Sequence, residues 1–352
     1  MKRIIALVLC VLCMASLFGC AKMSNLGSGG ADTNADGSEK TLKSETMFNF
    51  LVMGHDREAS LTDVIMLVSY DTESGKMSIM QLPRDTYIEI EDYSYSKING
   101  LYNHCVSEAK AEGSDNKALD GCRKAADYLS AALGVPIHYC AVMDLDGFGA
   151  IVDAVGGVEI YVPYAMEYED EDQNLYINLD KGYNTLDGNE AEQFVRYRSG
   201  YVNADLGRGD AQKMFMTAFI EAVKENIGVK NVGDIAAAIM KNVETDLKLH
   251  EIVEFGTKFI GIELSDITMM TAPGEVASSY YVLNKECLTQ VLNESFNIYV
   301  EDLTEDEVDK NVLFCSEKAA VIAVYEKAAE ELDFDKHNAQ DVSDEDIYVP
   351  LK

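Results

Sequence analysis

The chain has 352 residues, 47% of them hydrophobic, and its 29 Lys and Arg against 61 Asp and Glu give a formal net charge of −32 at pH 7. A chain of this length and composition can bury one large core or two ordinary ones. The charge argues against a general nucleic-acid-binding protein, because a phosphate backbone requires clustered Lys and Arg. It also argues against a polybasic protein of the membrane surface.

The N-terminal residues 1–20 are typical of an export signal. Two basic residues precede the apolar stretch 4–18, which is shorter than the roughly 20 residues that a spanning helix needs. The stretch closes on Leu-Phe-Gly-Cys, which resembles a bacterial lipobox, so we expect a lipoprotein-type signal peptide with Cys20 lipidated. Phe18 departs from the small residue usual there, and an uncleaved N-terminal signal anchor is the alternative. Either form tethers the protein to the extracytoplasmic face of the bacterial membrane, with residues 21–46 as a flexible linker rich in Gly, Ser, Asp and Asn.

Three strands are expected at the start of the folded part. Residues 48–53 and 64–70 are apolar runs, and 77–82 is a third run that stops at Pro83, which cannot donate to a sheet ladder. The turn residues 71–76 make the second and third strands antiparallel neighbours.

Charged residues gather at one end of these three strands. Asp56 and Asp63 lie between the first two strands and Arg84 follows the third, so the reversals of the chain bring all three to one rim of the sheet. Two carboxylates and a guanidinium suit a hard cation together with a phosphate, because Mg²⁺ takes one or two carboxylates and fills its octahedron with phosphate oxygens and water. The alternative is that the aspartates only cap or turn the loop backbone.

The rest of the core alternates helices and strands. Asp146 is the expected N-cap of one helix, and Asp187 with Glu190 has capping-box spacing at the start of another. We expect an α/β (α+β) sandwich, with a mixed central β-sheet flanked by helices. The remaining expected elements are helices near 98–110, 120–133, 146–155 and 211–227 and strands at 138–143 and 158–162.

A second group of charged residues follows Val195. On a continuing helix Arg196 and Arg198 would point roughly 200° apart, so either the helix ends here or only one of the two faces a site. Arg208 adds a third guanidinium nearby in the sequence. Arginine suits a phosphate ligand because its planar fork holds two oxygens and stays charged. The alternative is that these arginines pair with the acidic run 167–172.

The cysteines give little indication of the protein's chemistry. Cys105 and Cys122 bracket a polar loop between two helical stretches and are the best candidates for a disulfide, whereas Cys140 is expected to be buried in a strand. No Cys or His cluster has zinc spacing.

The C-terminal residues 301–352 form an acidic tail that is expected to be partly helical. Residues 301–346 hold 16 acidic and 4 basic residues, a net of −12. Thr304 and Glu307 have capping-box spacing. A solvated, solubilising surface is the simplest interpretation, and a site for a specific partner is the alternative.

Several motifs occur in one order along the chain. They are NFLVMGHDR, TDVIMLVS, LPRDTY, KINGLY, DGFGAIVDAVGGVEIYVP, QNLYINLDKGYNTLDGNEAEQFVRYR and DLGR. Each is weak alone, but together they resemble the LytR–CpsA–Psr family of cell-envelope proteins, in that family's order, from Met47 to near Asn297. We therefore treat residues 47–300 as a catalytic domain of this type.

The resemblance implies a phosphotransferase that moves a glycopolymer from an undecaprenyl-pyrophosphate carrier to peptidoglycan or a related envelope acceptor. By matched motif, Asp56 and Asp63 would hold Mg²⁺. Asp205 or Asp63 could serve as the base for the acceptor hydroxyl. Arg84, Arg196 and Arg198 would bind the pyrophosphate. The residues with implied catalytic roles are Arg84, Arg196, Arg198, Asp205 and Arg208, and the residues that would bind substrate are Lys97, Asn99 and Gln212.

Two departures from the family pattern leave other functions open. His55 stands where a small polar residue is usual, and Ala211 stands where a further arginine is usual. The lost charge would weaken affinity for the lipid carrier or shift its specificity. The main alternative is a non-catalytic envelope lipoprotein that binds polyprenyl phosphates, and a third possibility is a sugar-binding or scaffold lipoprotein that uses its acidic surface.

Overall fold

The computed structural model describes residues 40–56, 61–90, 92–93, 95–170, 175–197, 206–226, 232–277, 279–308 and 313. The signal peptide with Cys20, residues 21–39 of the predicted linker and most of the acidic tail lie outside these ranges, so the predicted domain boundaries stay predictions. Among the described helices, none combines the length and the apolarity that a membrane crossing requires. The residues of the predicted site that lie outside the description are Arg198, Asp205 and the side chains of Asp56, Arg208 and Gln212.

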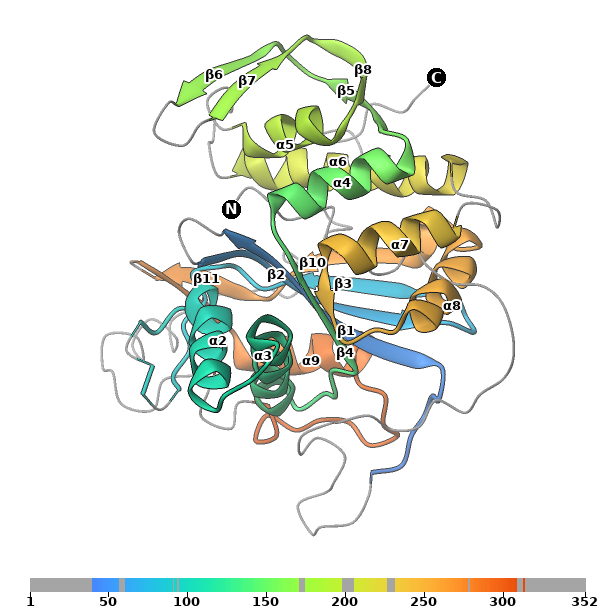
Figure 1. The fold of residues 1–352 in the computed structure, drawn as a ribbon. Coiled ribbons are helices and arrows are strands. Elements are labelled where there is room, and N and C mark those ends of the chain that lie inside the picture. Colours follow the sequence, from blue (N-terminus) through green and yellow to red (C-terminus); the bar gives the residue numbers. More distant parts are fainter. Residues whose placement is uncertain are drawn as a thin grey trace.

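A six-stranded mixed sheet forms the centre of the fold, in the order β10-β3-β2-β1-β4-β9 (Figure 1). β1 pairs with β4 and β10 pairs with β3 in parallel, and the other neighbours are antiparallel. The predicted mixed sheet and the antiparallel order of the first three strands are therefore confirmed. The strands are β1 (Met47–Asp56), β2 (Leu61–Asp71), β3 (Met77–Gln81), β4 (Tyr139–Met143), β9 (Glu244–Thr245) and β10 (Ile267–Thr271).

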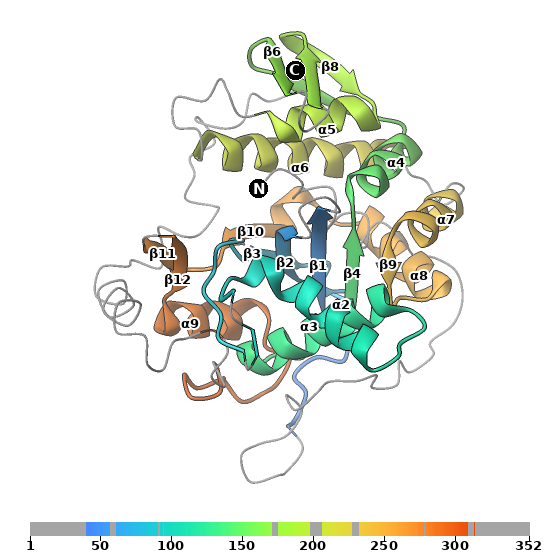
Figure 2. The same cartoon turned by 60° about the vertical axis from the view of Figure 1, so that its left-hand side comes forward.

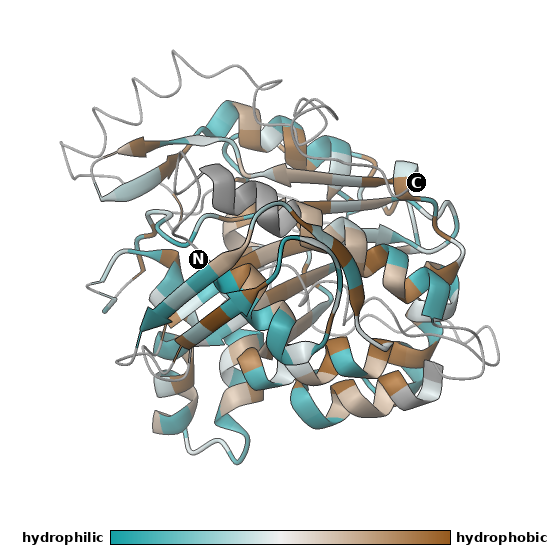
Figure 3. Ribbon diagram, turned by 90° about the horizontal axis from the view of Figure 1, so that it is seen from above, coloured by the Kyte–Doolittle hydropathy of each residue, from teal (hydrophilic) through white to brown (hydrophobic). Residues whose placement is uncertain are grey.

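Both faces of the sheet are covered, because successive side chains of each strand enter opposite cores. In β1, Phe50 and Val52 belong to one core, and Leu51 and Met53 belong to the other. Coloured by hydropathy, the helices show hydrophobic and hydrophilic residues side by side (Figure 3). The second core is covered by α2 (Leu101–Ala111), α3 (Lys117–Leu133) and α9 (Lys285–Ser295), and the first by α4 (Leu145–Val155), α5 (Gly188–Arg196), α6 (Leu206–Asn226), α7 (Val232–Asn242) and α8 (Leu249–Ile260).

Short antiparallel strand pairs lie outside the central sheet. β5 (Val158–Val162) pairs with β8 (Gly182–Leu186), and β6 (Met166–Asp170) pairs with β7 (Leu175–Leu179). In Figure 1 these four strands lie above α5, on the side away from the central sheet. The last pair is β11 (Gly274–Ala277) with β12 (Tyr280–Leu283), and two short 3-10 segments, Ile98–Gly100 and Leu264–Asp266, complete the described elements.

Helix ends follow the local sequence with one correction. The capping box of Asp187 and Glu190 is present at the start of α5, as predicted. The N-cap of α4 is Asp144 and not Asp146, because the Asp144 carboxylate accepts the Gly147 N–H at 2.9 Å while Asp146 falls in the first helical turn. Helix α6 begins at Leu206, five residues before the predicted start at 211. The predicted helix is therefore present, with an earlier start than the sequence indicated.

The predicted disulfide is wrong. Cys105 and Cys122 are free and fully buried, and Cys140 is buried in β4 as expected. The loop that they bracket does turn the chain, but α2 and α3 direct these thiols into the core, where they pack as small apolar groups. Burial raises the pKa of Cys122, and so does its hydrogen bond with Cys140.

Candidate functional site at the rim of the central sheet

Arg84 and Asp63 meet at the end of the central sheet, as the sequence predicted. Leu82 donates its N–H to the Ile65 carbonyl at 2.9 Å, which continues the β2–β3 ladder and brings the next residues beside the start of β2. The Arg84 Nη1 then donates to Asp63 Oδ1 at 2.9 Å. The side chains are 30% and 14% exposed, so this ion pair is partly shielded from water. A guanidinium and a carboxylate thus share one partly buried position.

Asp85 is a member of this cluster that sequence reasoning did not assign. Its Oδ1 accepts a hydrogen bond from Lys97 Nζ at 2.8 Å, and its Oδ2 lies 3.7 Å from Arg84 Nε. The carboxylate therefore lies between two cations of the predicted site, Arg84, which was assigned to the pyrophosphate, and Lys97, which was assigned to substrate binding. Its position directly after Arg84 was visible in the sequence, but its contact with Lys97 depends on the fold of the intervening loop.

The loop from 84 to 100 is held in place by its backbone. Asn99 donates its N–H to the Arg84 carbonyl at 3.1 Å, and Ile98 donates to the Thr86 carbonyl at 2.9 Å. Tyr281 of β12 donates its N–H to the Asp85 carbonyl at 2.8 Å. These bonds bring the Lys-Ile-Asn motif back against the Leu-Pro-Arg-Asp motif, although the two are more than ten residues apart.

Lys97 and Asn99 are both in position to complete the cluster. The Lys97 Nζ lies 5.5 Å from the centroid of the Tyr280 ring, which adds a cation–π contact to its ion pair. Asn99 is 2% exposed, and within the described residues its Oδ1 has no hydrogen-bond partner.

Arg196 lies in the helical layer above the sheet. It is the last residue of α5, is 9% exposed, and donates from Nη1 to Glu192 Oε1 at 2.7 Å. Tyr197 then adopts an extended conformation with φ −64° and ψ 135°, so the chain leaves the helix before Arg198. The helix therefore ends between the two arginines, which is one of the two arrangements left open by the sequence. The described ion pair of Arg196 is with its own helix, not with the acidic run 167–172.

Helix α5 is fixed to α4 by a close crossing. A Cβ atom on Gly188 would collide with the Gly149 backbone, so this approach requires a glycine. Figure 2 shows the C-terminal end of β1 pointing toward the layer that holds α5 and α6. The elements that carry the two predicted charge clusters therefore face each other across the first core.

The remaining predicted residues are placed only by their backbone. Asp56 ends β1 and pairs with Leu61, and the β1–β2 register shifts between Gly54 and His55. Asp56 and Asp63 thus lie at the same end of the sheet. Arg208 and Gln212 lie four residues apart in α6.

The donor set fits a magnesium ion better than a zinc ion. Within the described residues there is no group of three or more His, Cys, Asp or Glu that could hold a metal. A pair formed by Asp63 and Asp56 is what Mg²⁺ takes when phosphate oxygens and water supply its other ligands. The metal assignment of both residues stays a prediction.

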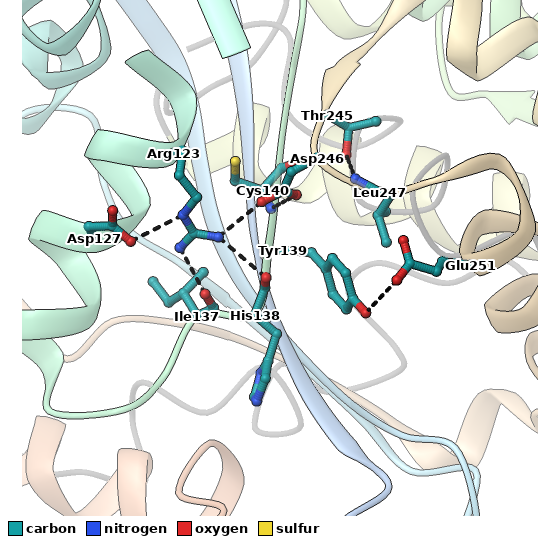
Figure 4. A network of polar contacts seen from close by, with 10 residues as sticks. All are labelled: Arg123, Asp127, Ile137, His138, Tyr139, Cys140, Thr245, Asp246, Leu247 and Glu251. Atoms are coloured by element: carbon teal, nitrogen blue, oxygen red, sulfur yellow. Dashed lines mark hydrogen bonds and ion pairs between the residues drawn. The ribbon is translucent and has the colours of Figure 1, made fainter. Parts of the chain in front are cut away.

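Arg123 belongs to a separate network with a structural role (Figure 4). From α3 it donates to Asp127, to Asp246 and to the backbone carbonyls of Ile137 and His138, at 2.8 to 3.3 Å. Asp246 also accepts the Cys140 N–H at 2.8 Å. This guanidinium therefore ties α3 to β4 and to the chain after β9. Protein groups accept four hydrogen bonds from this guanidinium, which has five N–H donors, so its described role is structural.

A protein-family model matches the part of the chain that forms these elements. Residues 20–297, which include the rim cluster and both helices of the upper layer, match the model of the LytR_cpsA_psr family. The chain belongs to the LytR–CpsA–Psr family. The resemblance expected from the motifs is thereby confirmed.

Individual relatives agree with this membership. A polyisoprenyl-teichoic acid–peptidoglycan teichoic acid transferase TagU from Oceanobacillus iheyensis is 27% identical over 258 residues, which is 72% of this chain and 76% of that protein. The polyisoprenyl-teichoic acid–peptidoglycan teichoic acid transferase TagV from Bacillus subtilis is 26% identical over 292 residues, which is 78% of this chain and 71% of that protein. The crystal structure of a LytR-Csp2A-Psr enzyme from Actinomyces oris has a TM-score of 0.53 at 20% identity and covers 73% of this chain and 93% of its own, which shows a shared fold.

Proposed function

We propose that this protein is a phosphotransferase that moves a glycopolymer from an undecaprenyl-pyrophosphate carrier to peptidoglycan. The observation that carries the proposal is the rim cluster, in which Arg84 contacts Asp63 while Lys97 is held by Asp85. A cluster of cations and carboxylates at a sheet rim suits a charged diphosphate and its metal ion. Family membership and the activities for which the two relatives are named support the same chemistry.

In the proposed reaction, a hydroxyl oxygen of the acceptor attacks the phosphorus atom that bears the glycopolymer. A new P–O bond to the acceptor forms, the bridging P–O bond breaks, and polyprenyl monophosphate leaves with the bond electrons. Arg84, Arg196 and Lys97 would neutralise the phosphate oxygens, which is the main requirement of phosphoryl transfer. Arg198, Arg208 and Gln212 would complete the set from the segment around the start of α6.

The hydroxyl proton requires a base. Asp63 is engaged with Arg84 and is our candidate metal ligand, so we assign the base role to Asp205. When bound by Asp56 and Asp63, Mg²⁺ would supply positive charge to the developing oxyanion. We further propose that lipidation of Cys20 anchors the enzyme to the outer surface of the bacterial membrane, where both the carrier lipid and peptidoglycan are accessible.

A non-catalytic lipid-binding lipoprotein is the second candidate. It is favoured by Ala211, which stands where the family usually has an arginine. Such a protein would copurify with a polyprenyl phosphate but would release no polyprenyl monophosphate from a pyrophosphate-linked donor.

Product analysis tests the proposal. The purified protein is incubated with a radiolabelled polyprenyl-pyrophosphate glycan, Mg²⁺ and purified peptidoglycan. We expect label in the peptidoglycan and an equal amount of polyprenyl monophosphate in the organic phase. Tight lipid binding without either product would contradict the enzyme and support the lipid-binding alternative. Absence of both binding and transfer would contradict both.

A further inference from the structure

The strands β5 to β8 form two successive two-stranded antiparallel sheets, which we together call the ribbon and each of which we call one half of it. β5 pairs with β8, and the chain then continues through β6 and β7, which pair with each other. The inner side chains of both halves enter the same core as α5 and α6, among them Ile160, Ile177 and Leu186. Because side chains alternate along a strand, the opposite face of both halves points away from this core.

The outer face of the ribbon carries three tyrosines. Tyr161 and Tyr183 are cross-strand partners, and their rings pack edge to face with centroids 5.1 Å apart. Tyr176 lies on the other half of the ribbon. Tyr183 and Tyr176 are 51% and 55% exposed, which is unusual for large aromatic side chains. An exposed aromatic face of this kind marks an interaction site.

Carboxylates are interleaved with these rings. Glu169 is the direct cross-strand partner of Tyr176, and Glu159 precedes Tyr161 by two positions on the same face. Glu167 of β6 is the cross-strand partner of Asn178 and lies on the outer face of the β6–β7 half, and all three glutamates are exposed. Aromatic rings beside carboxylates therefore recur along the whole ribbon.

This chemistry favours a carbohydrate over the other partners that a −32 chain could meet. A tyrosine ring offers a flat apolar surface for the C–H face of a sugar, and a carboxylate accepts hydrogen bonds from its hydroxyl groups. The same glutamates would repel polyanions, including nucleic acid, phosphate-rich polymers and anionic membrane surfaces. The charge of the face thus selects a polyhydroxylated partner that carries little negative charge.

We propose that the outer face of the ribbon binds a neutral glycan strand. The inference rests on the proposed function, in which the acceptor is such a strand. Gln193 of α5 accepts the Asn178 N–H of β7 at 2.8 Å, so the ribbon is fastened to the helix that ends at Arg196. A glycan strand bound on the ribbon is therefore attached to the helical layer that carries Arg196, which is predicted to bind the phosphate.

A binding experiment without donor lipid tests this surface. Titration of the full-length protein with N-acetylglucosamine hexamer is followed by tyrosine fluorescence, which is readable because the chain has no Trp. Tyr183→Ala and Tyr176→Ala are each expected to weaken binding about tenfold, whereas Tyr183→Phe keeps the ring and changes it less than about twofold. Leu249→Ala, an exposed position on α8, is the matched control and should bind like wild type.

Three results would overturn the proposal. The first is that the hexamer does not bind, and the second is that wild type and both alanine variants bind it equally. The third is that the tyrosine fluorescence responds to anionic vesicles or to self-association and not to the glycan. The transfer assay separates the two proposals. Intact transfer without hexamer binding contradicts only the proposed glycan binding by the ribbon. Ribbon-dependent binding without transfer contradicts only the proposed transferase activity.

Discussion

Arg84 donates to Asp63 across 2.9 Å and thereby joins the end of β3 to the start of β2. The contact places a planar guanidinium beside the predicted metal ligand before any substrate arrives. A substrate phosphate would meet a site in which positive and negative groups are already positioned, so little reorganisation is needed on binding.

The planar shape of the Arg84 guanidinium should contribute to transfer in addition to its charge. Arg84→Lys keeps the cation but loses the paired N–H donors, so kcat/KM for transfer should fall about tenfold to a hundredfold. Lys124→Ala is the control, since the Lys124 ion pair with Glu112 lies on the surface. A lysine variant with wild-type kcat/KM would mean that Arg84 acts only as a point charge.

Asp85 should position the two cations beside it. Asp85→Asn keeps the shape but removes the charge that orients Lys97 and Arg84. We expect KM for the lipid donor to rise about tenfold with a smaller change in kcat, because ground-state contacts are lost first. Asp85→Glu should restore part of the loss. The positioning role fails if the asparagine variant has the KM of wild type or if glutamate rescues nothing.

Removal of the Arg123 network should destabilise the fold. Arg123→Ala removes the guanidinium that donates to Asp246 Oδ2 and to two backbone carbonyls, which should cost about 2–4 kcal/mol of unfolding free energy. Lys124→Ala, one residue further along α3, should cost less than about 0.5 kcal/mol. Urea denaturation of both variants measures the difference, and similar midpoints would show that the network contributes little.

His138 should make the fold sensitive to acid. Burial lowers its pKa to about 4 from an ordinary value of 6.5, while its Nδ1 accepts the Asn49 N–H at 2.9 Å. The folded state thus binds this proton less readily than the unfolded state. The contribution of His138 to the free energy of unfolding is complete above about pH 6.5 and falls as the pH drops toward 4. It amounts to at most about 3 kcal/mol.

Denaturation curves at pH 7 and pH 4.5 test the histidine. His138→Gln should reduce the stability difference between the two pH values, and His250→Gln, at an exposed position on α8, should leave it unchanged. Equal pH dependence of wild type and His138→Gln would assign the acid sensitivity to other groups.

The sequence predicted those parts of the fold that depend on short connections. The tight turn at 71–76 dictates that β2 and β3 are antiparallel, and this brings Arg84 to Asp63. The capping box of Asp187 is equally local. Asp85 was missed because its partner Lys97 returns only through a long loop pinned by Tyr281. The Cys105–Cys122 disulfide failed because loop composition says nothing about where a helix directs a thiol.

The most direct test of the account is the Mg²⁺ dependence of transfer by wild type, Asp63→Ala and Arg84→Ala. Label transfer from polyprenyl-pyrophosphate glycan to peptidoglycan is measured as Mg²⁺ is titrated after chelation, with circular dichroism to confirm that each variant is folded. We predict that chelation abolishes wild-type transfer, that Asp63→Ala needs a higher Mg²⁺ concentration, and that Arg84→Ala loses about a hundredfold in rate at saturating Mg²⁺. Transfer that persists in chelator and is unchanged by both substitutions would contradict the central role of the Arg84–Asp63 pair.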